Sequence, residues 1–246
     1  MKGNRTLILI SVVSLLIIWK IAAILVGYSF ILPAPEQVFC AMIDLLAEQS
    51  FYQSVFATVI RSFAGLLTAF LSAGAFAFVA WKHQWFAAWF SPWLLLMRSI
   101  PNISYILLIL YWCSRNSSSI IISFLILFPM IYQIMFESLK ELGRTYQNVL
   151  KIYPKRWSQA VLHVYLPLLR PAIAASLCNG VAMAFKVGVM AEILGQVNIG
   201  VGRAMQLARL NFDLVNVLAW TGWIIILLFC SDQIVKKIVK TVCRGI

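Results

Sequence analysis

The amino-acid sequence predicts an all-α, polytopic membrane protein with about six transmembrane helices. Hydrophobic residues make up 62% of the 246 residues and charged residues only 11%, whereas soluble domains carry roughly 25% charged residues. Apolar runs of about 20 residues, the length that crosses a bilayer core, recur along the chain. The net charge of +12 arises from basic residues in the loops that flank these runs. Composition therefore favours membrane lipid as a partner and excludes nucleic acid.

Six candidate transmembrane segments follow one another along the chain. They cover residues 7–27, 55–80, 85–112, 119–136, 171–194 and 215–235. The first has no small-residue cleavage site, so we expect it to be retained rather than removed as a signal peptide. The third is interrupted by Arg98-Ser-Ile-Pro101, and we expect a kink there because proline cannot complete the helical hydrogen bonds.

The loop between the first two spans carries a further helical signal. Pro35 suits the first turn of a helix, and apolar residues at helical spacing follow it as far as Leu46. We expect a short amphipathic helix there, lying at the extracytoplasmic interface of the membrane.

Lysine and arginine residues are distributed unevenly between the loops. The loop over residues 28–54 contains none, whereas residues 140–170 contain six and the C-terminal tail contains four more. Because positive charges mark the cytoplasmic side of a membrane protein, we expect both termini and the basic loop to lie in the cytoplasm.

The basic loop, with the sequence QNVLKIYPKRWSQAVLHVYLP at residues 147–167, has its own helical pattern. Gly143 can end the helix of the fourth span and Thr145 can cap a short helix over residues 146–153. Pro154 stops that helix and suits the start of another. The pattern favours a compact helix–turn–helix on the cytoplasmic face, and a solvated basic loop that only sets topology is the alternative.

Several polar residues lie inside the predicted spans. Lys186 is midway along the fifth, where a lysine costs about 2.5–3.5 kcal/mol on insertion scales. It is a candidate anion-attracting residue of a substrate path, and the alternative is a structural pair such as one with Glu192. Glu192 could equally pair across a dimer or with Arg61. Asn179 extends a polar face of the same helix or bonds to a neighbouring helix. Arg61 and Arg98 either tie spans together or face the path.

The basic loop resembles the EAA loop of ABC importer permeases. That loop reads Glu-Ala-Ala, three residues, Gly, nine residues, then Ile-x-Leu-Pro, and residues 164–167, Val-Tyr-Leu-Pro, resemble its end. Lys-Arg-Trp at 155–157 resembles the Ser-Arg-Trp that follows the glycine. If Trp157 sets the register, residues 147–149 replace Glu-Ala-Ala and Tyr153 replaces Gly. If Pro167 sets it, residues 148–150 and Pro154 take those places.

The resemblance implies that this loop couples the protein to an ATPase. The residues that it implies for this coupling are Gln147, Asn148, Leu150, Lys151, Tyr153, Pro154, Lys155, Arg156 and Trp157.

Other segments resemble permeases of the nitrate, sulfonate and taurine importer family, in the same order along the chain. Residues 31–39, ILPAPEQVF, resemble the Leu-Pro-Ser-Pro-x-x-Val segment after the first span, and residues 98–101 resemble Arg-Pro-Ile-Pro. Residues 191–195, AEILG, resemble Ala-Glu-x-Leu-Gly at the end of the fifth span. Residues 199–202 and 208–213 resemble the segment between the fifth and sixth spans of the same permeases.

This resemblance implies a single permease domain over residues 1–246, with the family core at 55–240 and the coupling loop at 144–166. It implies the membrane subunit of an ATP-driven importer in a prokaryotic cell membrane, which passes a small, in many relatives anionic, solute from an extracytoplasmic binding protein into the cytoplasm. The chain has no Gly-x-x-x-x-Gly-Lys-Ser/Thr loop. We therefore expect no cofactor and no catalysis, with ATP bound by a separate ATPase subunit, and a second permease chain completing a homodimer.

Two other classes of protein compete with this interpretation. A secondary transporter or channel, without an ATPase partner, would show inverted repeats or broken helices with paired ion-binding carboxylates, and the sequence indicates neither. An intramembrane enzyme would carry a motif such as His-Glu-x-x-His or Gly-x-Ser-x-Gly, and neither occurs. The five cysteines are scattered, which argues against a metal site.

Overall fold

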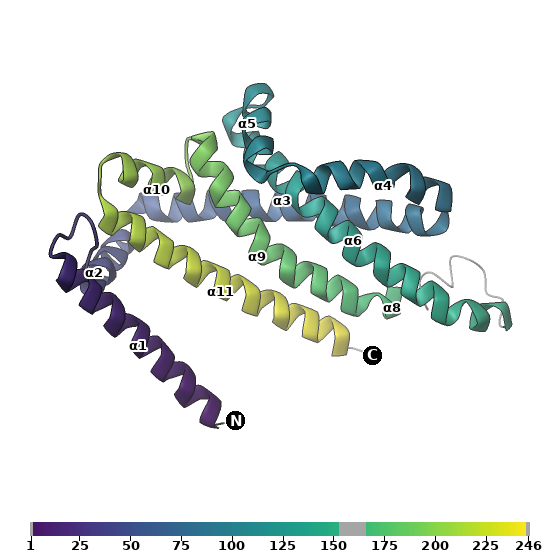
Figure 1. Ribbon diagram of the computed structural model, residues 1–246, viewed down its shortest axis with the longest axis horizontal. Coiled ribbons are helices and arrows are strands. Elements are labelled where there is room, and N and C mark those ends of the chain that lie inside the picture. The colour runs from purple at the N-terminus through teal and green to yellow at the C-terminus, as the bar shows by residue number, and fades with distance from the viewer. Residues whose placement is uncertain (1, 153–165, 245–246) are drawn as a thin grey trace.

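The computed structural model describes residues 2–152 and 166–244, and the side chains of residue 7 and of residues 10–115, 117–142 and 167–237. The described residues form helices and no strand, and Figure 1 shows them as an elongated bundle. In chain order they are α1 (Lys2–Val26), α2 (Pro35–Leu46), α3 (Gln49–Lys82), α4 (Gln84–Ser99), α5 (Asn102–Trp112), α6 (Arg115–Ile152), α8 (Leu166–Leu168), α9 (Arg170–Gly195), α10 (Val201–Leu210) and α11 (Leu214–Arg244).

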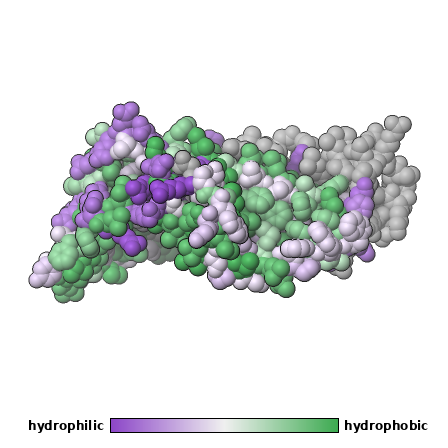
Figure 2. All heavy atoms as spheres, turned by 90° about the horizontal axis from the view of Figure 1, so that it is seen from above, coloured by the Kyte–Doolittle hydropathy of each residue, from purple (hydrophilic) through white to green (hydrophobic). Residues whose placement is uncertain are grey.

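The apolar segments predicted from the sequence are helices of the structure. Within the described residues, four helices hold an apolar stretch long enough to cross a bilayer, and these are α3, α6, α9 and α11. The pair α4 and α5 would supply a fifth span, and α1 contains the apolar stretch Ile10–Val26 among the residues described. Hydrophobic residues dominate the middle of the face in Figure 2, with hydrophilic residues gathered at the end that carries α2 and α10. The all-helical, polytopic membrane fold is thereby confirmed.

The third predicted span is broken rather than kinked. The axes of α4 and α5 differ by 97° across a break of a few residues. The Tyr105 hydroxyl on α5 donates a 2.8 Å hydrogen bond to the Met97 carbonyl near the end of α4. This bond supplies a partner to one of the carbonyls that the interrupted helix leaves open.

The core lies where α3 packs against α6 and α9. Small residues recur along one stripe of α3, at Gly65, Ala69, Ala73 and Ala77, and the three alanines are fully buried. A Cβ atom at Gly65 would lie 2.6 Å from Cβ of Ser123 on α6. The stripe therefore lets the two backbones approach closely, as small residues do in membrane helix pairs.

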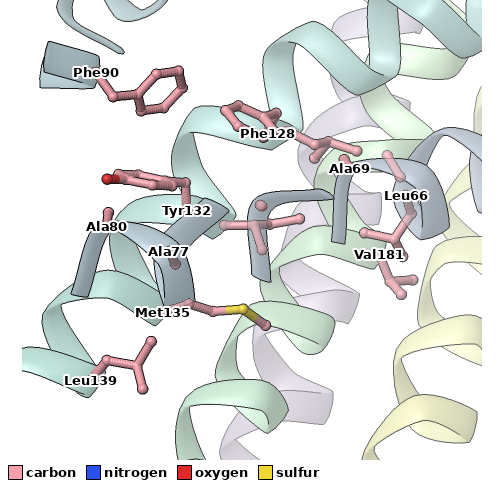
Figure 3. Packing of buried hydrophobic residues seen from close by; sticks show 14 of the residues in the cluster. Leu66, Ala69, Ala77, Ala80, Phe90, Phe128, Tyr132, Met135, Leu139 and Val181 are labelled. Atoms are coloured by element: carbon pink, nitrogen blue, oxygen red, sulfur yellow. The ribbon is translucent and has the colours of Figure 1, made fainter. Parts of the chain in front are cut away.

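Several aromatic side chains pack together at the end of the core where α4 meets α3 and α6. Figure 3 shows Phe90 of α4 beside Phe128 and Tyr132 of α6. The ring centroids of Phe90 and Tyr132 are 5.3 Å apart at an interplanar angle of 63°. Such tilted aromatic pairs contribute about 0.5–1.5 kcal/mol beyond their buried area, and here they anchor α4 to the core.

The predicted amphipathic helix is confirmed as α2, and it packs against α11. Val38 and Leu45 are buried, whereas Phe39 on the other face is 52% exposed. The indole of Trp223 on α11 donates a 3.1 Å hydrogen bond to the Met42 carbonyl at the same contact.

Helix α1 stands apart from the bundle in Figure 1 and is linked to it through the start of α2. Trp19 donates a 3.1 Å indole hydrogen bond to the Pro33 carbonyl. The Lys20 ammonium donates a hydrogen bond to the Glu36 carboxylate and thereby lowers the pKa of that carboxyl.

Candidate functional site

A buried acidic residue organises one end of the α9 helix. The Glu192 side chain has no exposed surface. Its Oε2 accepts hydrogen bonds from the Thr58 hydroxyl at 2.8 Å and from the Gly202 amide at 3.0 Å. Its Oε1 accepts a 3.0 Å bond from Nη1 of Arg61, which forms the ion pair. The carboxylate thus joins α3, α9 and α10.

The same residues cap the start of α10. The Val201 amide donates a 2.9 Å bond to the Thr58 hydroxyl, next to the bond from Gly202 to Glu192. Nη1 of Arg61 also donates a 2.6 Å bond to the Ile199 carbonyl. A carboxylate at a helix N-terminus satisfies unpaired amides and stabilises the helix dipole. We call this arrangement the Glu192 clasp: the side chains of Thr58, Arg61 and Glu192, with the backbone of residues 199–202.

Two glycines make room for the clasp. A Cβ atom at Gly200 would lie 2.6 Å from Oε2 of Glu192. A Cβ atom at Gly202 would lie 2.6 Å from both Cβ of Glu192 and the Val189 carbonyl oxygen. Real Cβ atoms do not approach other atoms so closely, and part of the obstacle at Gly202 is backbone. The glycines of the sequence IGVG are therefore explained by the close approach of α10 to Glu192.

The open face of α9 carries the other two predicted path residues. Asn179 and Lys186 are exposed, and a separation of seven residues places them on one face of the helix. Met183, between them, is 37% exposed. By the rise of a helix, Lys186 lies about 24 Å from Arg170 and about 13 Å from Gly195 along α9. A cationic side chain therefore lies within an apolar span, on a face that the described residues leave exposed.

The four predicted path residues thus fall into two groups. Lys186 and Asn179 share the open face of α9, whereas Arg61 and Glu192 belong to the clasp. The ion pair of Glu192 is with Arg61, so the alternative pair between Lys186 and Glu192 is not formed. The Glu192 side chain has no exposed surface, whereas Lys186 is exposed.

The predicted end of the fourth helix at Gly143 is wrong. Helix α6 continues from Arg115 to Ile152 without interruption, so residues 146–152 are its last turns and not a separate helix. A glycine inside a helix costs only about 1 kcal/mol, and Pro154 is the next proline after Pro129. The apolar run of α6 ends at Phe136, directly before Glu137, so 16 further residues extend α6 by about 24 Å beyond that run.

Four of the predicted ATPase-coupling residues lie in this extension. Gln147, Asn148, Leu150 and Lys151 are in the last turns of α6, where the structure describes the backbone but not their side chains. Tyr153, Pro154, Lys155, Arg156 and Trp157 lie outside the described residues.

Comparison with known proteins identifies the class to which this arrangement of helices belongs. Residues 63–242 match the family described as binding-protein-dependent transport system inner membrane component. The chain belongs to this family and is a multi-pass inner membrane permease subunit of an ABC transporter. Members of the family work in general with an ATPase and a binding protein.

A curated relative of the chain has a more specific name than the family. The chain is 24% identical to the formylaminopyrimidine transport permease protein ThiX of Halalkalibacterium halodurans over 206 residues, which cover 83% of this chain and 82% of the relative.

Sequence reasoning missed Thr58 and the amides of α10 as partners of Glu192. The sequence did contain one signal for such partners, which is the scarcity of acidic residues in the spans. Glu192 and Asp232 are the only acidic residues inside the six predicted spans. A lone acid in a span needs a partner there. Arg61 and the Thr58 hydroxyl, one turn before it, become the partners of Glu192 because α3 packs against α9. The sequence alone does not show which helices pack together.

Proposed function

We propose that the chain is the permease subunit of an ATP-driven importer of the nitrate, sulfonate and taurine type. It passes a small solute, with anions as the favoured class, from an extracytoplasmic binding protein into the cytoplasm. In this proposal the chain is one domain over residues 1–246, has both termini in the cytoplasm and forms a homodimer.

The observation that carries the proposal is the position of Lys186. A lysine in the middle of a span is retained where it faces a cavity or partner, and Lys186 is on the open face of α9 rather than in the core. In a dimer that brings two such faces together, two lysines would line one passage. This arrangement supports attraction of an anionic solute.

The extension of α6 supports coupling to an ATPase. Its last turns carry helical residues about 24 Å beyond the apolar run that ends at Phe136, at the segment whose sequence resembles the EAA loop. We propose that residues 144–166 contact an ATPase subunit, which binds and hydrolyses ATP. The permease itself then needs no cofactor and performs no catalysis.

The name of the curated relative suggests one solute to test. ThiX is described as a formylaminopyrimidine transport permease, so a formylaminopyrimidine joins taurine and nitrate in the first panel. The alternative of a secondary transporter gains little from the broken span, because the charged residue at the break is Arg98 and not a pair of carboxylates.

Reconstitution tests the proposed function. The permease is co-expressed with its ATPase and binding protein, purified, placed in proteoliposomes and supplied with ATP inside and radiolabelled solute outside. We expect an ATPase subunit to co-purify and uptake to require ATP. Uptake of the same solute by the permease alone would contradict the proposal and favour the secondary transporter.

A further inference from the structure

A cavity of about 400 Å³ lies at the break between α4 and α5. Side chains from four helices line it, among them Met97, Arg98, Asn102, Met130, Gln133 and Met183. Its volume is in the range of small-molecule sites, which are commonly about 300–1,000 Å³. Met183 belongs to the open face of α9, so the cavity adjoins the face that carries Lys186.

The cavity lies in the interior of the apolar spans. The cavity residues of α6 run from Ile126 to Ile134, inside the apolar run at residues 119–136. Met183 is close to the middle of α9, which runs from Arg170 to Gly195. A solute in the cavity would therefore lie among the apolar spans.

Among the described residues that line the cavity, Arg98 is the one that carries a charge. Its guanidinium donates a hydrogen bond to Oε1 of Gln133, whose Nε2 in turn donates a 2.7 Å bond to Glu137. Glu137 itself is not part of the cavity lining. The described contact with Gln133 engages one of the five N–H donors of Arg98. The planar guanidinium matches a carboxylate, sulfonate or phosphate, which can accept two of its bonds.

The broken helix adds to the attraction for an anion. Helix α5 begins at Asn102, which lines the cavity, and no side chain caps its N-terminus. The positive end of the helix dipole and its open amides are therefore at the cavity edge. Irregular backbone inside a membrane is tolerated where it lines such a cavity.

The rest of the wall is apolar and adaptable. Met97, Met130 and Met183 reach it from α4, α6 and α9, and thioether side chains adjust to flat ligands and contact aromatic rings favourably. One cationic end and a methionine-lined body favour an elongated ligand with an anionic group at one end.

We propose that this cavity is a binding site of the permease for a small organic anion with a flat apolar body, and that Arg98 binds the anionic group. The role of this anion as transported solute rests on the proposed function, whereas its binding does not.

Thiol labelling of the permease alone tests the site. Met183→Cys is made in a chain whose native cysteines are replaced by alanine, and the protein is placed in nanodiscs. The rate of thiol labelling is measured with an anionic methanethiosulfonate (the sulfonatoethyl reagent) and with a cationic one (the trimethylammonium reagent). Each rate is divided by the rate at which the same reagent reacts with free cysteine, and the two corrected rates give an anionic-to-cationic ratio. We expect Arg98→Gln to lower the anionic-to-cationic ratio about tenfold, which is the effect of one charge at close range in a partly hydrated site. Arg98→Lys should keep the ratio within about threefold.

The matched control is Arg209→Gln, which removes an exposed arginine on α10 and should leave the ratio unchanged. Benzenesulfonate is the ligand analogue, and we expect it to slow labelling of Met183→Cys in the presence of Arg98, whereas benzamidine should not. This protection experiment needs no substitution of Arg98, so it holds even where Arg98→Gln does not fold.

A ratio that is the same with and without Arg98, or equal protection by both ring compounds, would overturn the site. The outcome is independent of the ATPase. Labelling that depends on Arg98 without any ATP-driven uptake would keep the site and reject the proposed function. ATP-driven uptake together with labelling that does not depend on Arg98 would reject the site and keep the proposed function.

Discussion

Removal of the Glu192 carboxylate should destabilise the protein more than loss of any exposed ion pair. Glu192→Ala removes the carboxylate that is ion-paired with Arg61 and that accepts hydrogen bonds from Thr58 and the Gly202 amide. Loss of one partner of a buried ion pair typically costs about 3–5 kcal/mol. The Arg61 side chain is 14% exposed and keeps its bond to the Ile199 carbonyl, so we expect the lower part of that range. We therefore predict that the free energy of unfolding falls by about 3–4 kcal/mol.

The assay is unfolding in mixed micelles of dodecyl maltoside and sodium dodecyl sulfate, followed by tryptophan fluorescence. Asp232→Ala is the control because the side chains of its pair with Lys236 are 27% and 56% exposed, so its loss should cost less than loss of the buried pair. In a double-mutant cycle, Arg61→Met should recover part of the loss caused by Glu192→Ala, since neither charge of the buried pair then remains. A loss for Glu192→Ala as small as that for Asp232→Ala would refute the role of the clasp.

Three further predictions concern transport and packing. Lys186→Met should lower ATP-driven uptake several-fold while dimer yield on size-exclusion chromatography stays within about twofold, and equal losses in both would favour a structural role for Lys186. Trp157→Glu should let the reconstituted ATPase hydrolyse ATP without solute uptake while insertion into the membrane is normal, and normal uptake would count against coupling through this segment. Gly65→Val should lower the free energy of unfolding by about 1–3 kcal/mol because its Cβ would meet Ser123 at 2.6 Å, and a neutral effect in the mixed-micelle assay would show that α3 and α6 can move apart.

Much of the fold could be predicted from the sequence because lipid imposes a simple rule. An apolar run in a membrane satisfies its backbone by forming a helix, so α3, α6, α9 and α11 follow from composition. The amphipathic helix over residues 35–46 also carried its own signal in Pro35 and the spacing of its apolar residues.

The extent of the breaks was less predictable. Pro101 indicates an interruption, but its angle of 97° depends on how α5 meets α6 and α9. Gly143 indicates a helix end, yet α6 continues through it. A single glycine is a weak breaker, and Pro129 likewise lies inside α6.

The polar residues of the candidate site could be listed from the sequence, whereas their grouping could not. Lys186, Asn179, Arg61 and Glu192 were all recognised as polar residues inside or near spans. Helical spacing alone places Asn179 and Lys186 together. The bond between Arg61 and Glu192 joins residues 131 positions apart, and only the packing of α3 on α9 brings them into contact.

The proposed function depends above all on contact between residues 144–166 and an ATPase subunit, and site-specific photo-cross-linking detects such a contact. Benzoylphenylalanine replaces Asn148 in one variant and Tyr28, in the predicted extracytoplasmic loop, in the control, and each permease is irradiated in the purified complex. We expect a cross-linked species with the mass of permease plus ATPase from the variant at residue 148 and none from the control. A co-purified ATPase that forms no cross-link at residue 148, or one that cross-links equally at residue 28, would contradict the proposed coupling.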